Sequence, residues 1–262
     1  METGLRDRVA VVAGSTHGLG RAAAFALAAE GAHIALCARN AQALEDVAAK
    51  IRERYGVQTN IHALDVRSSP AIQQFVSNAA EVFGRIDVCV TNAGGPPAKD
   101  FLATTDEDWD EAFFLNLRSA ASLARAVIPY MQRQRWGRII TISSITVRQP
   151  QPQLILSNAI RAGVMGLVRT LANEFGKDGI LVNNIAPGYT ATERLKELSA
   201  TRASALGQTE EQIEKAWVDQ IPIGRLGKPE EVADAIVWLA SERASFVTGQ
   251  TILVDGGMYK GL

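Results

Sequence analysis

The sequence predicts an α/β fold built on a parallel sheet, and two observations support this. Short apolar runs rich in β-branched residues recur along the chain, as in strands that are buried on both faces. Longer segments with helical spacing separate these runs. Such alternation favours a parallel sheet covered by helices on both sides. We therefore expect a Rossmann-type, doubly wound sheet with three αβα layers.

Each apolar run is expected to form one strand, at residues 8–13, 33–38, 61–64, 86–91, 138–142, 180–185 and 251–254. Helices are expected at residues 19–30, 41–54, 71–83, 107–134, 157–175 and 229–239. In doubly wound sheets a ligand binds beyond the carboxyl ends of the strands, where the strand order reverses. Functional residues should therefore follow the strands directly.

The chain organisation indicates one domain. Its 262 residues suffice for one large core, and no repeat, low-complexity stretch or linker divides residues 1–262. Residues 190–225 break the rhythm, because they combine helical periodicity with many charges and contain no strand. A solvated helical pair would explain this pattern. We favour a mobile helical lid over a substrate pocket, since the segment directly follows a strand end.

Charge and cysteine content exclude several classes of function. The 27 basic and 28 acidic residues give a net charge of −1, which argues against a nucleic-acid partner and for a small-molecule ligand. Cys37 and Cys89 lie in strand-like runs and are expected to remain free thiols. The first residues resemble neither a signal peptide nor a membrane span. We expect a cytoplasmic protein without a membrane or metal partner.

A glycine-rich turn follows the first expected strand and precedes the first helix. Gly14 allows a tight turn, Gly18 lets the backbone approach a pyrophosphate, and Gly20 permits close packing of helix on strand. The amino end of the helix adds N–H donors and a positive dipole. Although glycines can serve a purely structural turn, this position between strand and helix favours a dinucleotide.

The spacing G-x-x-x-G-x-G resembles the short-chain dehydrogenases/reductases, and further matches follow in order along nearly the whole chain. They are Asp65-Val66 after the third strand, Thr91-Asn92-Ala93-Gly94 after the fourth, Asn116 in a helix, Ile142-Ser143-Ser144 after the fifth, the segment from Pro187 to Thr192, and the tail from GRLGKPEEVA to GQTILVDGG. The resemblance implies cofactor contacts from Gly14, Ser15, Thr16, His17, Gly18, Leu19, Gly20, Arg39, Asn40, Asp65, Val66, Asn92, Ala93, Gly94, Arg161, Pro187, Gly188, Thr190 and Thr192.

The end of the second strand predicts NADP(H) as the cofactor. Ala38 stands where NAD-preferring members of the family carry an acid that bonds the ribose hydroxyls. Arg39 can receive a 2′-phosphate instead, because guanidinium offers paired donors, and His17 stands where NADP-using relatives often place a base. Alternatively, Arg39 is only solvated and His17 is only a turn residue, in which case NAD(H) would serve.

The resemblance implies that Ser144 and Asn116 are catalytic residues, but the family's Y-x-x-x-K motif is missing. Its usual interval from Ser144 leads to Ser157 and Arg161 in place of the tyrosine and the lysine. A serine hydroxyl is less acidic and shorter than a phenol, so Ser157 could at best donate a hydrogen bond or hold water. Arg161 lies on the same helix face and could keep the lysine's electrostatic and ribose-binding roles. Ser157 could equally be only a helix cap.

Three functions remain open. In the one that we favour, the protein is an oxidoreductase acting on a carbonyl or alcohol, and its proton passes through Ser144, Asn116 and water, or through Tyr189. In the second, Arg161 binds an anionic substrate group for slower redox chemistry or for another acid–base reaction, such as an elimination or isomerisation. In the third, the protein binds a dinucleotide without turnover and acts as a sensor or assembly partner.

Substrate and assembly are less determined by the sequence. The pocket walls are expected from residues 95–100 and 145–154, from Tyr189 and from the segment after Thr192; their glutamines and Arg148 favour a polar or carboxylated substrate. The helices at 107–134 and 157–175 resemble the pair through which family members form dimers and tetramers. We expect a homo-oligomer, unless these helices only cover the sheet.

Overall fold

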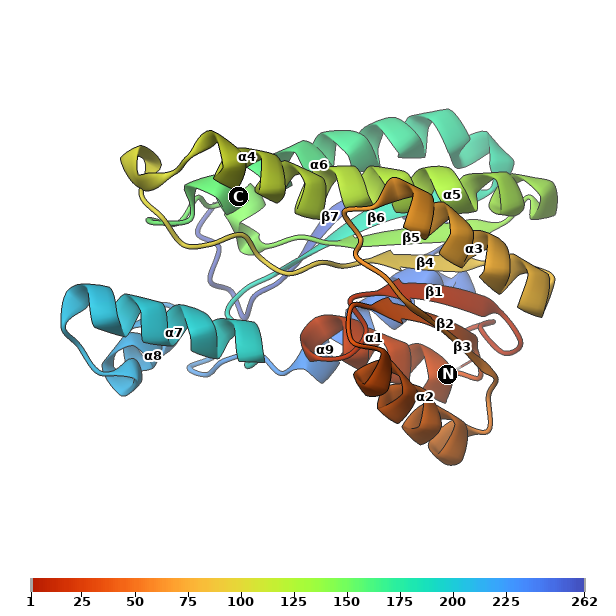
Figure 1. Ribbon diagram of the computed structural model, residues 1–262, viewed down its shortest axis with the longest axis horizontal. Helices are drawn as coiled ribbons and strands as arrows, with labels where there is room; N and C mark the ends of the chain where they lie inside the picture. Colours follow the sequence, from red (N-terminus) through yellow and green to blue (C-terminus); the bar gives the residue numbers. More distant parts are fainter. Residues whose placement is uncertain (1, 262) are drawn as a thin grey trace.

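The structure is a computed structural model that describes residues 2–261, and it is built on one seven-stranded parallel sheet (Figure 1). The strands are β1 (Val9–Ala13), β2 (His33–Ala38), β3 (Thr59–Ala63), β4 (Val88–Thr91), β5 (Gly137–Ile142), β6 (Ile180–Pro187) and β7 (Thr251–Val254). Their order in the sheet is β3-β2-β1-β4-β5-β6-β7, so the chain reverses direction across the sheet between β1 and β4. The predicted parallel sheet is confirmed.

Helices cover both faces of this sheet (Figure 1). One face carries α1 (Gly18–Ala29), α2 (Ala41–Tyr55) and α9 (Pro229–Ala240). The other face carries α3 (Ser69–Phe83), α5 (Ser119–Gln134) and α6 (Ile155–Phe175). Short 3-10 turns occur at Phe101–Ala103, Ile145–Val147, Gly176–Asp178 and Glu242–Ala244. The three αβα layers agree with the sequence-based expectation.

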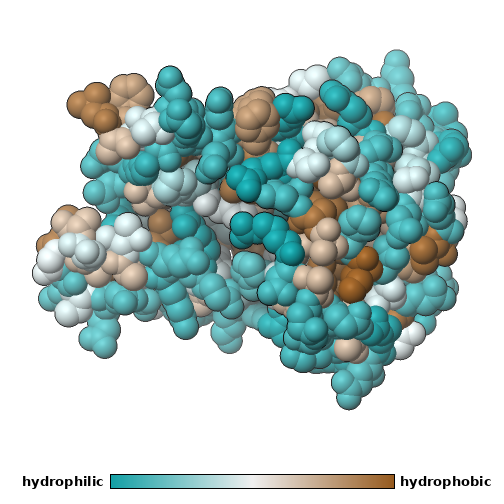
Figure 2. Space-filling view, in the orientation of Figure 1, coloured by the Kyte–Doolittle hydropathy of each residue, from teal (hydrophilic) through white to brown (hydrophobic). Residues whose placement is uncertain are grey.

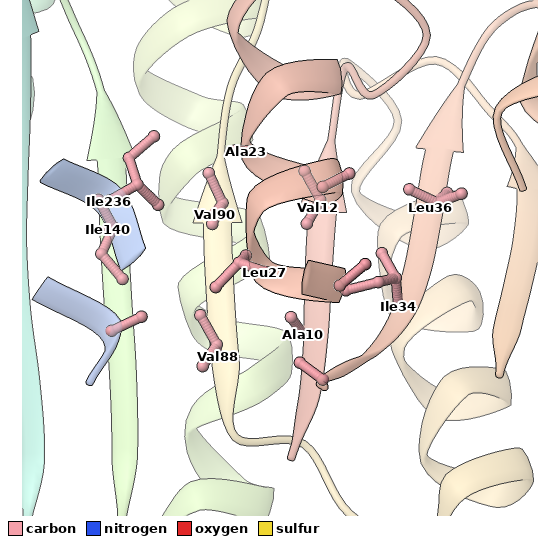
Figure 3. Close-up of a cluster of buried hydrophobic side chains, with 14 of the residues drawn as sticks. Ala10, Val12, Ala23, Leu27, Ile34, Leu36, Val88, Val90, Ile140 and Ile236 are labelled. Carbon is pink, nitrogen blue, oxygen red and sulfur yellow. The ribbon is translucent and has the colours of Figure 1, made fainter. Parts of the chain in front are cut away.

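Alternation along the strands divides the core into two halves, because successive side chains point to opposite faces. In Figure 3, Ala23 and Leu27 of α1 and Ile236 of α9 lie over one face. The strand residues labelled there are Ala10, Val12, Ile34, Leu36, Val88, Val90 and Ile140. Intervening residues such as Val11 and Cys89 pack toward α3, α5 and α6. This double burial explains why the strands read as continuous apolar runs.

The segment without a strand forms two helices, α7 (Glu193–Leu206) and α8 (Glu210–Val218). In Figure 1 this helical pair projects beyond the sheet, below helix α4 (Asp106–Ala112) and the carboxyl-terminal end. It has a small apolar cluster of its own, which contains Leu195, Ile213 and Trp217. The pair is thus anchored only at its ends and through a few side chains.

Two predicted helices differ from the structure. The single helix expected at 107–134 is divided into α4 (Asp106–Ala112), a π-helical turn (Phe113–Arg118) and α5. A π turn inserts one extra residue per turn, which a periodicity of 3.6 does not reveal. Helix α6 begins at Ile155 with Leu154 at its N-cap, two residues before Ser157, and Leu156 in its first turn is fully buried. Ser157 lies inside the first turn, so the hypothesis that it caps this helix is wrong.

Both cysteines are buried and unpaired, as predicted. Burial raises the pKa of Cys37 to about 12, so its thiol stays protonated and behaves as a small apolar group. Within residues 2–261, no helix has both the length and the apolar character needed to span a membrane.

A buried carboxylate ties β1 to β4 at the amino ends of the strands. Asp87 is fully buried, accepts a hydrogen bond from the backbone N–H of Val9 (2.9 Å), and is paired with Arg8 (3.1 Å) and Arg85 (2.7 Å). Three partners offset the cost of burying this charge, because each donates to a carboxylate oxygen.

The substitution Asp87→Ala should therefore lower the free energy of unfolding by about 3–5 kcal/mol, since it leaves buried donors without an acceptor. Urea unfolding monitored by circular dichroism measures this change. Arg85→Ala should cost much less, because its side chain is 40% exposed and water can replace it. Equal effects of the two substitutions would contradict this account of the network.

Candidate active site

The carboxyl ends of β1, β4, β5 and β6 bring the predicted site residues to one edge of the sheet. Because β1 lies between β2 and β4, the chain leaves β1 and β4 toward opposite faces of the sheet, with α1 on one face and α5 on the other. Leu19, Ala93, Gly94 and Pro187 all lie in or next to the loops at this edge. The strand order thus assembles residues that are far apart in the sequence.

The glycine turn after β1 has a backbone conformation that favours glycine at two places. Gly14 and Gly18 have φ values of 60° and 55°, in the left-handed region. At Gly20 a Cβ atom would collide with the carbonyl oxygen of Gly14 and would lie 2.6 Å from Nδ2 of Asn92. That amide donates to the Gly14 carbonyl at 3.2 Å. The turn therefore packs directly against the residue that follows β4.

The amino end of α1 has no side-chain cap. His17 occupies the N-cap position in an extended conformation, and its ring Nδ1 lies 3.0 Å from Oγ1 of Thr16. Ser15 is fully buried and donates to the Cys37 carbonyl at 3.3 Å, so its hydroxyl points into the sheet. The N–H groups of the first turn remain to be satisfied, which suits an anion such as a pyrophosphate.

Beyond this turn, the ends of β2 and β3 carry the residues expected near the adenosine part of a cofactor. Arg39 is exposed, and Asn40 caps α2 by accepting from Ala43 N at 3.0 Å. Asp65, which precedes Val66, is paired with Arg67 at 2.7 Å, and hydrogen bonding to this guanidinium lowers the pKa of the carboxyl. Arg39 has no carboxylate within ion-pair distance in the described part of the chain.

The hydroxyls after β5 are connected through one threonine. Ser144 Oγ accepts from the backbone N–H of Thr146 at 3.2 Å. Ser157, which is buried, forms a hydrogen bond with the Thr146 hydroxyl at 3.2 Å. Ser144 and Ser157 are therefore neighbours, but their hydroxyls bind Thr146 and not each other.

Arg161 is the charged group at the centre of the site. Its side chain is only 7% exposed, and it donates to the Ser143 carbonyl at 2.6 Å and to the carbonyls of Ile142 and Gly94 at 3.4 Å. Its Nε has no protein partner in the described structure. Burial, and secondarily Arg194, lower its pKa to about 10, so the guanidinium remains charged at neutral pH.

Asn116 lies in the π turn and faces the same region. Its Nδ2 donates to the Ala112 carbonyl at 3.3 Å, a position that the π turn creates. A cavity of about 10 Å³ lies between Asn116, Ser143, Thr141 and Arg161. This volume holds roughly one water molecule, and the polar lining could bind it. A water there would also give Arg161 Nε an acceptor.

The loop after β6 links this edge to α7. Gly188 N donates to the Val254 carbonyl at 3.0 Å, and the Thr190 hydroxyl donates back to Gly188 at 3.3 Å. Thr192 caps α7, and a Cβ atom on Gly18 would lie 3.6 Å from its methyl group. The glycine turn and the start of α7 therefore touch.

Tyr189 packs against the apolar cluster that contains Ile145, the residue after Ser144. Its ring stacks on Trp217 of α8 with centroids 4.8 Å apart, and its hydroxyl donates to Oε1 of Gln151 at 3.4 Å. Burial raises the pKa of this phenol. A role for Tyr189 as proton donor would require it to leave both partners.

Two arginines of α7 reach the opposite wall, and the sequence analysis missed both. Arg194 donates to the Pro96 carbonyl at 2.5 Å, and Arg202 donates to the Pro152 carbonyl at 3.2 Å. Figure 2 shows a hollow between the end of the molecule that carries α7 and α8 and the part that holds the sheet, with mainly hydrophilic residues around it. No motif signalled these contacts, because the partners are 98 and 50 residues apart.

Comparison with known proteins agrees with this architecture. The family model described as enoyl-(acyl carrier protein) reductase matches residues 13–259. A 3-oxoacyl-(acyl-carrier-protein) reductase of Aquifex aeolicus is 34% identical over 259 residues, which cover 99% of this chain and 100% of the relative.

Solved structures are similar over the whole chain. L-Sorbose reductase from Gluconobacter frateurii, solved with NADPH and L-sorbose, is 35% identical and has a TM-score of 0.95, with 100% of each chain covered. YwfH, an NADPH-dependent reductase involved in bacilysin biosynthesis, is 25% identical with a TM-score of 0.93, and 97% of this chain and 99% of YwfH are covered. Both the ordered motifs and these likenesses show that the chain belongs to the short-chain dehydrogenase/reductase family.

Proposed function

We propose that this protein is an NADP(H)-dependent oxidoreductase that transfers hydride between the nicotinamide and a small carbonyl or alcohol substrate. One observation carries the proposal: the strand order places the glycine turn, Asn92, Ser144 and Arg161 at the same edge of the sheet. A dinucleotide lying across this edge would have its pyrophosphate at α1 and its nicotinamide near Ser144.

The site fits such a cofactor in two respects. A Cβ atom at Gly20 would fill the space that the turn needs, and the amino end of α1 lacks a side-chain cap. Arg39 favours NADP(H), because its exposed guanidinium has no carboxylate partner within residues 2–261 and can bind a 2′-phosphate. The L-sorbose reductase and YwfH structures support this choice, since the first contains NADPH and the second is NADPH-dependent. We propose that the residues named in the sequence-based expectation, from Gly14 to Thr192, contact this cofactor.

We also propose that Ser157 and Arg161 occupy the places of the family's tyrosine and lysine. The bound nicotinamide supplies or accepts the hydride, so the chain must manage the proton. Ser157 is tied to Thr146, and Arg161 keeps its own protons at neutral pH. We propose that the proton passes through Ser144 and Asn116, with a water in the cavity that Asn116 and Arg161 line, while Arg161 stabilises the developing alkoxide. Tyr189 is the alternative donor, once it leaves Gln151.

The helical pair at residues 190–225 is proposed to act as a lid. It rests on the remaining protein through Arg194 and Arg202, which bind carbonyls of the two loops facing it. Because few contacts hold the helical pair, its opening should require less free energy than unfolding of the sheet.

Cofactor preference tests the role of Arg39. We expect tighter binding of NADPH than of NADH in titrations followed by nicotinamide fluorescence. Arg39→Ala should weaken NADPH binding roughly 10- to 100-fold, because it removes charge-assisted hydrogen bonds that contribute about 1.5–3 kcal/mol. NADH binding should remain unchanged, since NADH has no 2′-phosphate. Arg54→Ala removes an exposed charge from the end of α2 and serves as the control. Tighter binding of NADH by the wild type would refute the assignment.

Gly20→Ala tests the glycine turn. The added methyl group has backbone on two sides, so the turn must open at a cost of about 1–3 kcal/mol, and NADPH binding should weaken at least tenfold. Gly166→Ala is a matched control, because nothing lies within 4 Å of its Cβ position inside α6. Calorimetric titration with NADPH measures both variants. Normal affinity of the Gly20 variant would remove the pyrophosphate from this turn.

Arg161→Ala tests the catalytic assignment. A panel of ketones, aldehydes and alcohols, followed by the absorbance of the reduced nicotinamide, should identify substrates of the wild type. We expect the variant to bind NADPH more weakly and to lose turnover, because the site loses the buried cation at its centre. Circular dichroism and a melting curve show whether it folds. Unchanged affinity and turnover in a folded variant would exclude Arg161 from the site, and a wild type inactive on every compound would count against the proposed reaction.

A further inference from the structure

Two guanidinium groups from different helices meet at one loop of the proposed active site. Arg161 of α6 donates to the Gly94 carbonyl at 3.4 Å, and Arg194 of α7 donates to the Pro96 carbonyl at 2.5 Å. Between them, a Cβ atom on Gly95 would lie 2.9 Å from Nε of Arg194. The loop 94–96 is therefore flanked by two positive charges, one buried and one on the proposed lid.

These charges are poorly compensated by the protein. In the described part of the chain, Arg161 has only carbonyl oxygens as partners and Arg202 has no ion pair. Arg194 pairs with Glu197 at 3.3 Å, but this acid is on the same helix and its side chain is 67% exposed, so the pair contributes little. Arg225, in contrast, is paired with Glu231.

An unpaired buried cation is costly, and a second cation nearby raises the cost. Both burial and Arg194 disfavour the charged form of Arg161, although it stays charged at neutral pH. An anion placed beside loop 94–96 would be attracted by both groups and would offset this cost. Among anions, a carboxylate matches the planar fork of guanidinium donors, and it can take two parallel hydrogen bonds from one arginine.

We propose that the substrate carries a carboxylate, which Arg194 binds beside loop 94–96. The positive charge of Arg161, which contacts the same loop at Gly94, also attracts this carboxylate. This inference rests on the proposed redox function and narrows it to oxo acids and hydroxy acids. Arg194 acts as a specificity-determining residue. On substrate binding its guanidinium exchanges the Pro96 carbonyl, a neutral acceptor, for an anionic one, and charge-assisted hydrogen bonds are the stronger kind.

Because Arg194 belongs to α7, the same contact would hold the lid over the bound acid. Arg202, about two turns further along α7, keeps its contact with Pro152 and needs no change. With a neutral substrate of the same shape, Arg194 would keep its hydrogen bond to the Pro96 carbonyl, and closure of the lid would add no binding energy. Discrimination should therefore appear mainly between an acid and its ester.

Matched pairs of compounds test this directly. Pyruvate, 2-oxobutanoate and 4-oxopentanoate are compared with their methyl esters as substrates with NADPH. We expect kcat/KM for at least one acid to exceed that of its ester 100-fold or more. Arg194→Gln should reduce this preference at least tenfold, because it replaces the guanidinium by a shorter, neutral amide. Lys196→Gln removes an exposed charge from the same helix and should keep the preference. Esters used as well as acids, or a preference that survives in Arg194→Gln, would overturn the proposal.

Binding without turnover separates this inference from the redox function. Malonate and malonamide are titrated calorimetrically into the protein saturated with NADP⁺. Malonate should bind and malonamide should not, and Arg194→Gln should weaken malonate binding at least tenfold while Lys196→Gln does not. If malonate binds in this way but no carbonyl compound is reduced, the anion site stands and the redox function fails. Reduction of neutral carbonyls without any malonate binding supports the redox function and rejects the anion site.

Discussion

The pairing of β1 with β4 is the constraint on which the rest of the molecule depends. It reverses the strand order, and so it separates the loops that follow these two strands. The glycine turn then packs on Asn92 so closely that Gly20 has no room for a side chain. At the amino ends of the same two strands, the buried Asp87 accepts a hydrogen bond from Val9 and so links β4 to β1. The fold and the site are thus consequences of one strand pairing.

Arg161 shows how a buried charge can be accommodated without an acid. The carbonyl oxygens at the end of β5 and after β4 are oriented by the sheet, and they supply the negative ends of dipoles to the guanidinium. Dipoles solvate the cation but do not neutralise it, so its field still acts on whatever lies at loop 94–96. A lysine could donate to fewer of these carbonyls, because its ammonium has no fork.

The α7–α8 pair is the part of the molecule to which we assign substrate selection. Its own apolar cluster gives it internal order, while Arg194, Arg202 and Tyr189 make its contacts with the loops opposite. The contacts of Arg194 and Arg202 are polar, whereas Trp217 stacks on Tyr189, and in our proposal Arg194 exchanges its protein partner for the substrate. In our proposal the redox reaction takes place at the carboxyl edge of the sheet, and the α7–α8 pair selects the substrate.

The sequence by itself determined the alternation of strands and helices, the sheet they form and the glycine turn, because periodicity and glycine requirements are local properties of the backbone. It also determined the family, through Asn92, Ser144 and the other motifs in their order. Only the tertiary structure decided that Asn116 lies in a π turn, that Ser157 binds Thr146, and that Arg194 meets the loop beside Arg161. Those features arise where segments distant in the chain come into contact, and no local pattern encodes such a contact.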